Sequence, residues 1–211
     1  MPLPQRPYDD PVFSDFRADP DLHPLQTPSG RIELYSATIA SYGLRDVPGH
    51  AAWIEPTQWW RSPQAATYDL HLLCNQPSHR LHSQQDMGAA SRSTKVAARE
   101  AIRLHPADAA VRRLRDGDVA RVRSAQGTLL AGVVVTGAMS PGVAQMHTGA
   151  WYDPSAPDIA GCVNGNVNVL TRDVGTSTLA QGCSGAHVLV SVERYDGPLP
   201  PIRAYDPPHL D

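Results

Sequence analysis

The sequence predicts a mainly β protein with a few short helices, built as a compact barrel. Short apolar runs of strand-like composition recur through the middle of the chain, and glycine-containing turns separate most of them. Only one segment carries clear helix signals. Strands and helices therefore do not alternate regularly, as they would in a doubly wound parallel sheet, and this absence favours a barrel.

The predicted strands are runs of apolar and β-branched residues bounded by turn residues. In chain order they are Arg31–Tyr35, Tyr68–Cys74, Ala101–Leu104, Val119–Arg123, Thr128–Thr136, Val143–His147 and Val188–Arg194. Gln126-Gly127 predicts a hairpin, and the nearly unbroken apolar run that follows it is typical of a buried strand. A helix is predicted from His105 to about Leu114, because Pro106 stands near its first turn, where a missing N–H costs nothing.

The distribution of proline predicts the domain organisation. Most of the 20 prolines lie towards the two ends, whereas residues 78–140 contain only Pro106. Proline-rich segments are typical of irregular chain, so we expect a compact middle between two extended ends. The predicted parts are an N-terminal arm or linker from a preceding domain at 1–66, a barrel at 67–195 and a C-terminal tail at 196–211.

Composition argues against several partners. The net charge is −3 and no run of Lys and Arg exceeds two residues, so we expect no nucleic-acid partner. No stretch approaches the ~20 apolar residues of a membrane span, and no basic start with an apolar run predicts a signal peptide. The compartment stays open.

Cys74, Cys162 and Cys183 form no Cys-x-x-Cys pair, so we expect reduced, buried thiols and no iron–sulfur cluster or structural zinc.

Two segments, here called the first loop (75–84) and the second loop (161–185), are rich in amides, hydroxyls and glycines. Glycine lets backbone N–H groups approach an anion, and Arg80 or Arg172 could add bidentate bonds to phosphate. Asn and Gln side chains match the mixed donors and acceptors of a pterin or purine. The alternative, that both loops are ordinary turns using Asn and Gly for left-handed geometry, stays open.

Other chemistries have weaker signals. His79 and His82 could share a metal, but a third ligand at close spacing is missing. No Gly-x-Ser-x-Gly motif supports a nucleophilic serine, and no Gly-Lys-Ser/Thr follows Gly161 to make a Walker loop. We therefore predict no catalytic residue and no metal ligand in this chain. Trp151 and Tyr152 are expected to plug the barrel mouth rather than line a cavity.

Several motifs resemble the C-terminal domain of the dimethyl sulfoxide reductase family of molybdoenzymes, in the branch with biotin sulfoxide, trimethylamine N-oxide and dimethyl sulfoxide reductases. They occur in family order across nearly the whole chain, which makes the set specific. The matching stretches are Thr27–Tyr35, Asn75–Ser83, His105–Ala110, Asp116–Val119, Thr148–Asp153, Asn166–Ser177 and Leu179–Gly182.

The resemblance implies a double-psi β-barrel, of the aspartate-decarboxylase-like type, that binds bis(molybdopterin guanine dinucleotide) molybdenum in a longer reductase. The other domains of that reductase would be the partners of this chain, since the family's metal-ligating Ser lies in an earlier domain that nothing here matches. The isolated chain is then expected to hold no cofactor and to catalyse nothing. Implied cofactor contacts are Asn75, Gln76, Arg80, His82, Ser83, Gln84, Asn166, Asn168, Gly175, Thr176, Ser177 and Gln181.

The resemblance has departures and rivals. Asn164 and Val167 stand where relatives often have His and Pro, which bears on the rigidity of the second loop. Asp173 could accept bonds from a guanine edge, but we expect it to anchor its own turn. A self-processing decarboxylase on the same fold would need a Gly-Ser pair, which the sequence lacks. A stand-alone interaction module that pairs with a separate catalytic subunit stays open.

Overall fold

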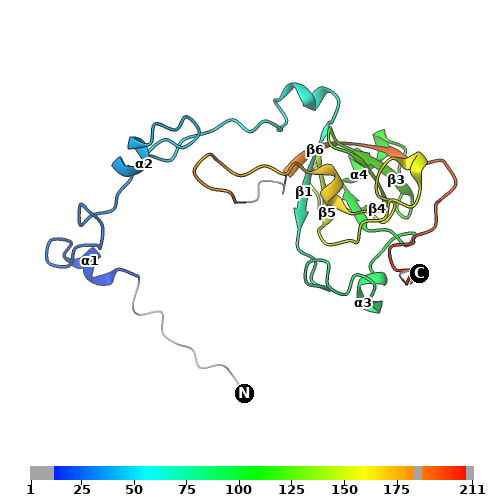
Figure 1. Cartoon of the computed structure of the whole chain (residues 1–211), viewed down its shortest axis with the longest axis horizontal. Coiled ribbons are helices and arrows are strands. Elements are labelled where there is room, and N and C mark those ends of the chain that lie inside the picture. The colour runs from blue at the N-terminus through cyan, green and yellow to red at the C-terminus, as the bar shows by residue number, and fades with distance from the viewer. Residues whose placement is uncertain (1–11, 183–186, 208–211) are drawn as a thin grey trace, which may run out of the picture. The chain divides into compact units, whose positions relative to one another are not determined.

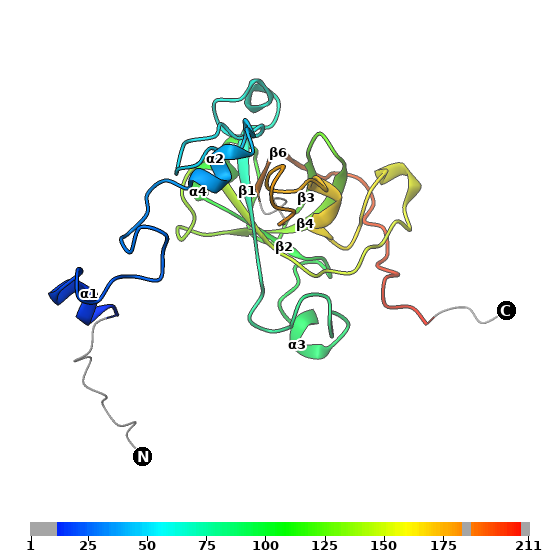
Figure 2. The same cartoon turned by 60° about the vertical axis from the view of Figure 1, so that its left-hand side comes forward.

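A computed structural model describes residues 12–182 and 187–207 of the chain (Figures 1 and 2). The helices are α1 (Ser14–Ala18), α2 (Ala37–Ser41), α3 (Ala89–Arg92) and α4 (Pro106–Val111), with 3-10 turns η1 (Pro63–Ala66), η2 (Pro157–Ile159) and η3 (Val167–Leu170). The strands are β1 (Leu70–Asn75), β2 (Ala101–Leu104), β3 (Val119–Arg123), β4 (Thr128–Val135), β5 (Val143–His147) and β6 (His187–Arg194). Among these residues, no helix has the length and apolar character needed to cross a membrane.

The chain divides into two units. The first comprises the described residues 12–54 and 177–179, and it contains the short helices α1 and α2. The second comprises 55–176 together with the described residues after 179, and it contains every strand named above. The division at 66/67 and 195/196 that proline distribution predicts stays a prediction.

The six strands close into a barrel in the order β1-β5-β2-β4-β3-β6. Two neighbouring pairs are parallel, β1 with β5 and β2 with β4, and the other four are antiparallel. If β1, β2 and β3 are exchanged with β4, β5 and β6, the same set of neighbouring pairs results, so the two halves of the barrel have equivalent topology. The predicted barrel is confirmed. Closure leaves no free strand edge, which protects the sheet from pairing with other chains.

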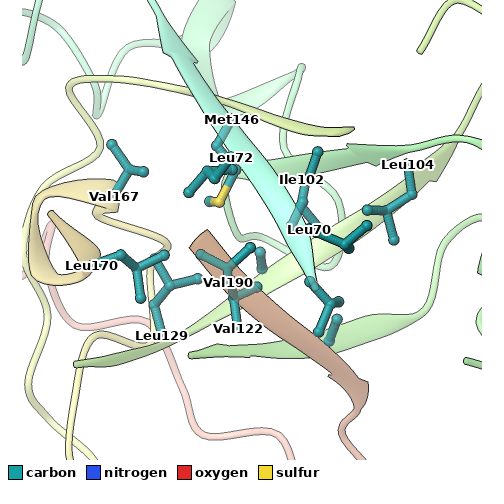
Figure 3. Close-up of a cluster of buried hydrophobic side chains, with 14 of the residues drawn as sticks. Leu70, Leu72, Ile102, Leu104, Val122, Leu129, Met146, Val167, Leu170 and Val190 are labelled. Atoms are coloured by element: carbon teal, nitrogen blue, oxygen red, sulfur yellow. The ribbon is translucent and has the colours of Figure 1, made fainter. Parts of the chain in front are cut away.

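Side chains from all the strands fill the barrel, as Figure 3 shows for Leu70, Ile102, Met146 and Val190. Strand β4 explains why its sequence is apolar almost throughout. Leu129 packs in the main cluster, whereas its neighbour Leu130 packs in a second cluster with Ile159 and Val163. Successive side chains of a strand point to opposite faces, so β4 is buried on both sides.

The sequence locates the barrel strands well, with ends within one or two residues. The predicted helix at 105–114 is shorter, because α4 ends at Val111 and Arg113 then adopts a left-handed backbone with φ 54°. That reversal brings the Leu114 N–H to the Ala109 carbonyl at 2.9 Å and buries the Leu114 side chain. Burial of one leucine, about 1.5–3 kcal/mol, outweighs three more residues of helix.

The predicted strand Arg31–Tyr35 is wrong. Only Tyr35 pairs, in an isolated bridge with His50, and the side chain of Leu34 is exposed. Side chains satisfy the backbone locally instead: the Ser29 N–H donates to Glu33, and the Thr27 hydroxyl donates to the Arg31 carbonyl. Alternating polarity predicts a strand only where another strand supplies the ladder, and none of the described strands pairs with this segment.

The cysteines have different environments. Cys162 is buried and Cys74 is half-buried, and both are free thiols. Cys183, which we also expected to be reduced and buried, lies outside the described residues. In the part of the chain described, no group of three or more His, Cys, Asp and Glu is arranged to hold a metal ion.

Candidate functional site: a polar cavity between the two loops

A cavity of about 420 Å³ lies at the carboxyl ends of the parallel strands β1 and β5. Most of its lining comes from the first loop and from the residues after β5, and Asn168 of η3 adds the second loop. The two loops that composition singled out therefore meet at one place. The lining residues are Cys74, Asn75, Gln76, His82, Ser83, Thr148, Gly149 and Asn168.

The parallel pairing of β1 with β5 fixes the amide side chains of the cavity. Asn75 is in register with His147, and the Thr148 N–H donates to the Asn75 carbonyl at 2.9 Å. The side-chain amide of Gln145 donates to the Asn75 side-chain oxygen. The Thr148 hydroxyl donates to the Gln76 side-chain oxygen at 3.4 Å. Both amide groups are thus held before any ligand arrives, one by a residue of β5 and the other by the residue that follows β5.

A close backbone contact forms the other side of the cavity. Gly149 has φ +90°, and a Cβ placed on it would lie 1.8 Å from the His82 carbonyl oxygen. The indole N–H of Trp151 donates to the Ser83 carbonyl at 2.7 Å. Only glycine permits this approach, which packs the first loop against the chain that follows β5. Trp151 therefore ties two segments together behind the cavity and is half-buried.

The lining is polar and carries no fixed charge. Among the described residues that line the cavity, none is Asp, Glu, Lys or Arg. Burial raises the pKa of the Cys74 thiol to about 11, so this group is neutral at pH 7. Amides, hydroxyls and imidazole offer both donors and acceptors, which suits the edge of a heterocyclic ring better than an isolated anion. The cavity can therefore recognise a pterin or a purine by hydrogen bonds.

Arg80, one of the predicted cofactor contacts, lies behind the cavity with a side chain that is 0% exposed. Its guanidinium donates to the His82 carbonyl at 3.3 Å and to the Thr148 carbonyl at 2.8 Å. It also donates to Ser91 at 2.9 Å and to Glu100 at 3.0 Å. The group thus holds two cavity-lining segments from the inside, and its direct contact with a cofactor stays a prediction.

Arg80 belongs to a buried ion cluster of two cations and two carboxylates, Arg80, Asp86, Lys95 and Glu100. The Lys95 ammonium lies 2.9 Å from Asp86 and 3.2 Å from Glu100. Burial alone would raise the pKa of Asp86, but hydrogen bonds from the Trp151 N–H and from Lys95 outweigh it and lower that pKa. Burial alone would lower the pKa of Lys95, but the nearby carboxylates raise it. All four groups are therefore paired, as buried charges must be.

The predicted contacts of the second loop have local partners. Asn166 caps η3, where its side-chain oxygen accepts the Asn168 N–H at 2.9 Å. A Cβ on Gly175 would lie 2.5 Å from the Gln181 side-chain oxygen. Thr176 donates its N–H to the Gly182 carbonyl and its hydroxyl to the Ala180 carbonyl, each at 3.0 Å. Residues 175–176 and 180–182 thus bond and pack among themselves.

The predicted cofactor contacts therefore fall into two groups, those that line the cavity and those that do not. The cavity brings together Asn75, Gln76, His82, Ser83 and Asn168. Gln84, Asn166, Gly175, Thr176 and Gln181 do not line it, and Ser177 belongs to the first unit. Asp173 is exposed, and its role stays a prediction.

Sequence reasoning missed three lining residues, Cys74, Thr148 and Gly149. Thr148 and Gly149 stand in a stretch that already matched the resemblance, so the motif carried a usable signal. Cys74 had none, because a lone thiol at a strand end looks like core.

Comparison with known proteins defines the class of this barrel. The family model described as "Molydopterin dinucleotide binding domain" matches residues 70–189, more than half of the chain. The chain belongs to the molybdopterin dinucleotide-binding domain family.

Curated relatives place the chain more narrowly. It is 43% identical over 198 residues to the dimethyl sulfoxide/trimethylamine N-oxide reductase of Rhodobacter capsulatus, covering 93% of this chain and 24% of the relative. It is 47% identical over 186 residues to trimethylamine-N-oxide reductase 1 of Escherichia coli strain K12, covering 86% and 22%. It is 44% identical over 195 residues to biotin sulfoxide reductase of Cereibacter sphaeroides, covering 90% and 25%. The chain spans about a quarter of the length of these relatives.

A solved structure supports the fold. Acetylene hydratase from Pelobacter acetylenicus superposes with a TM-score of 0.64 at 22% identity, covering 84% of this chain and 25% of that one. The mixture of parallel and antiparallel pairs agrees with this fold, as does the equivalence of strands β1–β3 with strands β4–β6. The fold is the double-psi β-barrel, as the resemblance implied.

Proposed function

We propose that this chain binds the guanine dinucleotide form of molybdopterin within a longer molybdenum reductase that removes oxygen from S-oxides or N-oxides. One observation carries the proposal: two loops far apart in sequence meet at a hydrogen-bonding cavity in a molybdopterin dinucleotide-binding fold. The names of the relatives support the reductase activity, because each of them reduces an S-oxide or an N-oxide.

The residues present fit the cofactor. Asn75, Gln76 and Asn168 would pair with the donors and acceptors of a pterin or guanine ring, and Ser83 would bond a phosphate oxygen. The volume of about 420 Å³ suits one ring system with part of its attachment. When bound, the molybdenum cofactor supplies the two-electron chemistry of oxygen-atom transfer, while the protein binds and orients it. The remaining contacts in the second loop are proposed for the rest of the dinucleotide.

The proposed partners are the other domains of the reductase. Because the chain covers about a quarter of its relatives, the substrate-binding region and the metal ligand would lie in those domains. The isolated chain would then bind the cofactor weakly and would not reduce a sulfoxide. Stoichiometric molybdenum and turnover in the purified 211-residue chain would contradict this division of labour.

A titration of the ¹⁵N-labelled chain with molybdopterin guanine dinucleotide tests the site. Amide shifts are expected to cluster at 75–84, at 148–149 and at 164–182. Asn168→Ala is expected to weaken binding about tenfold, the effect of losing one or two hydrogen bonds to the ligand. Gln64→Ala, an exposed amide in η1 away from the cavity lining, is the matched control and should leave affinity unchanged.

Two outcomes contradict the assignment. Amide shifts confined to other regions would place the ligand elsewhere. Equal binding by wild type and Asn168→Ala would remove the second loop from the site. Guanosine diphosphate in a parallel titration separates guanine recognition from pterin recognition, because only the whole cofactor carries both rings.

A further inference from the structure

The segment 200–205 after the barrel is fixed to it by buried groups. The Arg99 guanidinium donates to the Pro200 carbonyl at 2.5 Å. The Asp153 carboxylate accepts the N–H groups of Arg203 and Ala204 at 2.6 and 2.9 Å. Asp153 is 2% exposed, so these bonds are shielded from water. The segment therefore follows a defined path.

Tyr205 is the point at which this segment reaches the buried ion cluster. Its hydroxyl donates to Asp86 at 2.8 Å and lies 3.2 Å from the Asn164 side-chain oxygen. Its ring lies 5.7 Å from the ring of Trp151, and Lys95 lies 5.9 Å from its centroid. The ring contacts and the hydroxyl contacts are thus separate, because a phenylalanine would keep the first and lose the second.

Asp86, which accepts the hydrogen bond from Tyr205, also accepts hydrogen bonds from three other segments of the chain. One carboxylate oxygen accepts from Tyr205, from the Trp151 N–H at 2.9 Å and from the Asn164 amide at 3.4 Å. The other accepts from the Ser91 hydroxyl at 3.0 Å. The side chain is 0% exposed. Its orientation therefore sets the position of the chain after β5 and of the start of the second loop.

The cluster reaches the cavity in one further step. Arg80 lies 3.5 Å from Asp86 and donates to the carbonyls of His82 and Thr148, which both line the cavity. Trp151, which donates its N–H to Asp86, also bonds the Ser83 carbonyl. Two independent connections thus lead from Asp86 to the cavity.

We propose that Tyr205 is a positioning residue for the cofactor cavity: its hydroxyl orients Asp86, and Asp86 holds the first loop against the chain after β5. This role rests on the proposed function, because the cavity must first be shown to bind the dinucleotide. A cavity built on this connection is preorganised, so the ligand does not spend binding energy on ordering its loops.

The test compares Tyr205→Phe with wild type in the full chain, by titration with molybdopterin guanine dinucleotide. Tyr195→Phe is the matched control, because it also removes one phenol hydroxyl after β6, here bonded to the Pro198 carbonyl at 3.0 Å. Affinity is measured at a temperature where denaturation curves show all three proteins fully folded. A residue that only stabilises the fold does not change affinity under that condition.

Tyr205→Phe is expected to weaken binding about three- to tenfold, and Tyr195→Phe to leave it unchanged. The Trp151 amide resonance of the free protein should also move in Tyr205→Phe, because its acceptor has lost a partner. Equal affinity of Tyr205→Phe and wild type overturns the proposal, as does an equal loss in both variants. Absence of binding by wild type overturns the proposed function instead.

Discussion

Gly149 offers a quantitative test of the cavity geometry through Gly149→Ala. The added Cβ would lie 1.8 Å from the His82 carbonyl oxygen and 2.3 Å from its carbon, both backbone atoms that cannot rotate away. Backbone at φ +90° adds strain of about 1–2 kcal/mol for any L side chain. Forced separation of the two segments adds about 1–3 kcal/mol. The sum is about 2–5 kcal/mol of lost unfolding free energy.

Two other glycines separate these contributions. Gly142 has φ +80° but no atom within 4 Å of an added Cβ, so Gly142→Ala carries the strain alone. Gly137 has neither a positive φ nor a close neighbour, so Gly137→Ala should be neutral or stabilise by up to about 1 kcal/mol. The expected order of stability is Gly137→Ala, then Gly142→Ala, then Gly149→Ala.

Urea denaturation followed by far-ultraviolet circular dichroism measures all three variants on one scale. Only Gly149→Ala should also lose affinity for the guanine dinucleotide, because only its Cβ enters the cavity lining. Equal stability of Gly142→Ala and Gly149→Ala would show that the close approach to His82 does not exist. That result would refute the cavity geometry.

Three further predictions concern buried groups. Arg80→Met should lower the unfolding free energy in urea by about 3–5 kcal/mol, because it leaves buried carboxylates short of a partner; an unchanged midpoint would contradict the buried ion cluster. Alkylation of Cys74 by iodoacetamide should be slow at pH 8 and accelerate towards pH 11, because burial raises the thiol pKa to about 11; a plateau by pH 9 would contradict it. The folded-state pKa of Asp86 lies below its ordinary value of 3.8, so its stabilisation is present above about pH 4 and is lost as pH falls further. Asp86→Asn should therefore flatten the acid limb of stability against pH, and an unchanged limb would refute this.

The fold shows what apolar patterning can and cannot predict. Strands such as Ala101–Leu104 and Val143–His147 are found from sequence because Pro106 follows the first apolar run closely and Pro141-Gly142 precedes the second. Their order around the barrel is not, because parallel β1 and β5 join Asn75 to His147 across a long intervening chain. The wrongly predicted strand at 31–35 also reflects pairing that local sequence does not specify. Its pattern is correct for a strand, but in the described part of the chain only Tyr35 pairs, in the isolated bridge with His50.

The site was predictable where ligand chemistry and local sequence coincide. Asn75 and Asn168 are predicted because both stand in amide-rich loops, whose donors and acceptors match the edge of a pterin or purine. The burial of Arg80 could not be predicted, because an arginine in a polar loop normally faces water and its burial here depends on Asp86 and Glu100. These partners follow no periodic spacing, so nothing in the sequence pairs them. The role of Tyr205 is invisible for the same reason.

Stability alone does not account for a buried ion cluster at this place. Two charges removed from water lose about as much in desolvation as they regain by pairing, and apolar residues of equal volume are often as stable. The cluster instead fixes the positions of the groups around it, because hydrogen bonds to carboxylate and guanidinium groups are short and oriented. Arg80 fixes the carbonyls of His82 and Thr148 in this way. Under the proposed function, the cavity lining and the paired charges behind it have separate tasks: the amides would recognise the ring of the cofactor, and the ions fix the positions of the amides.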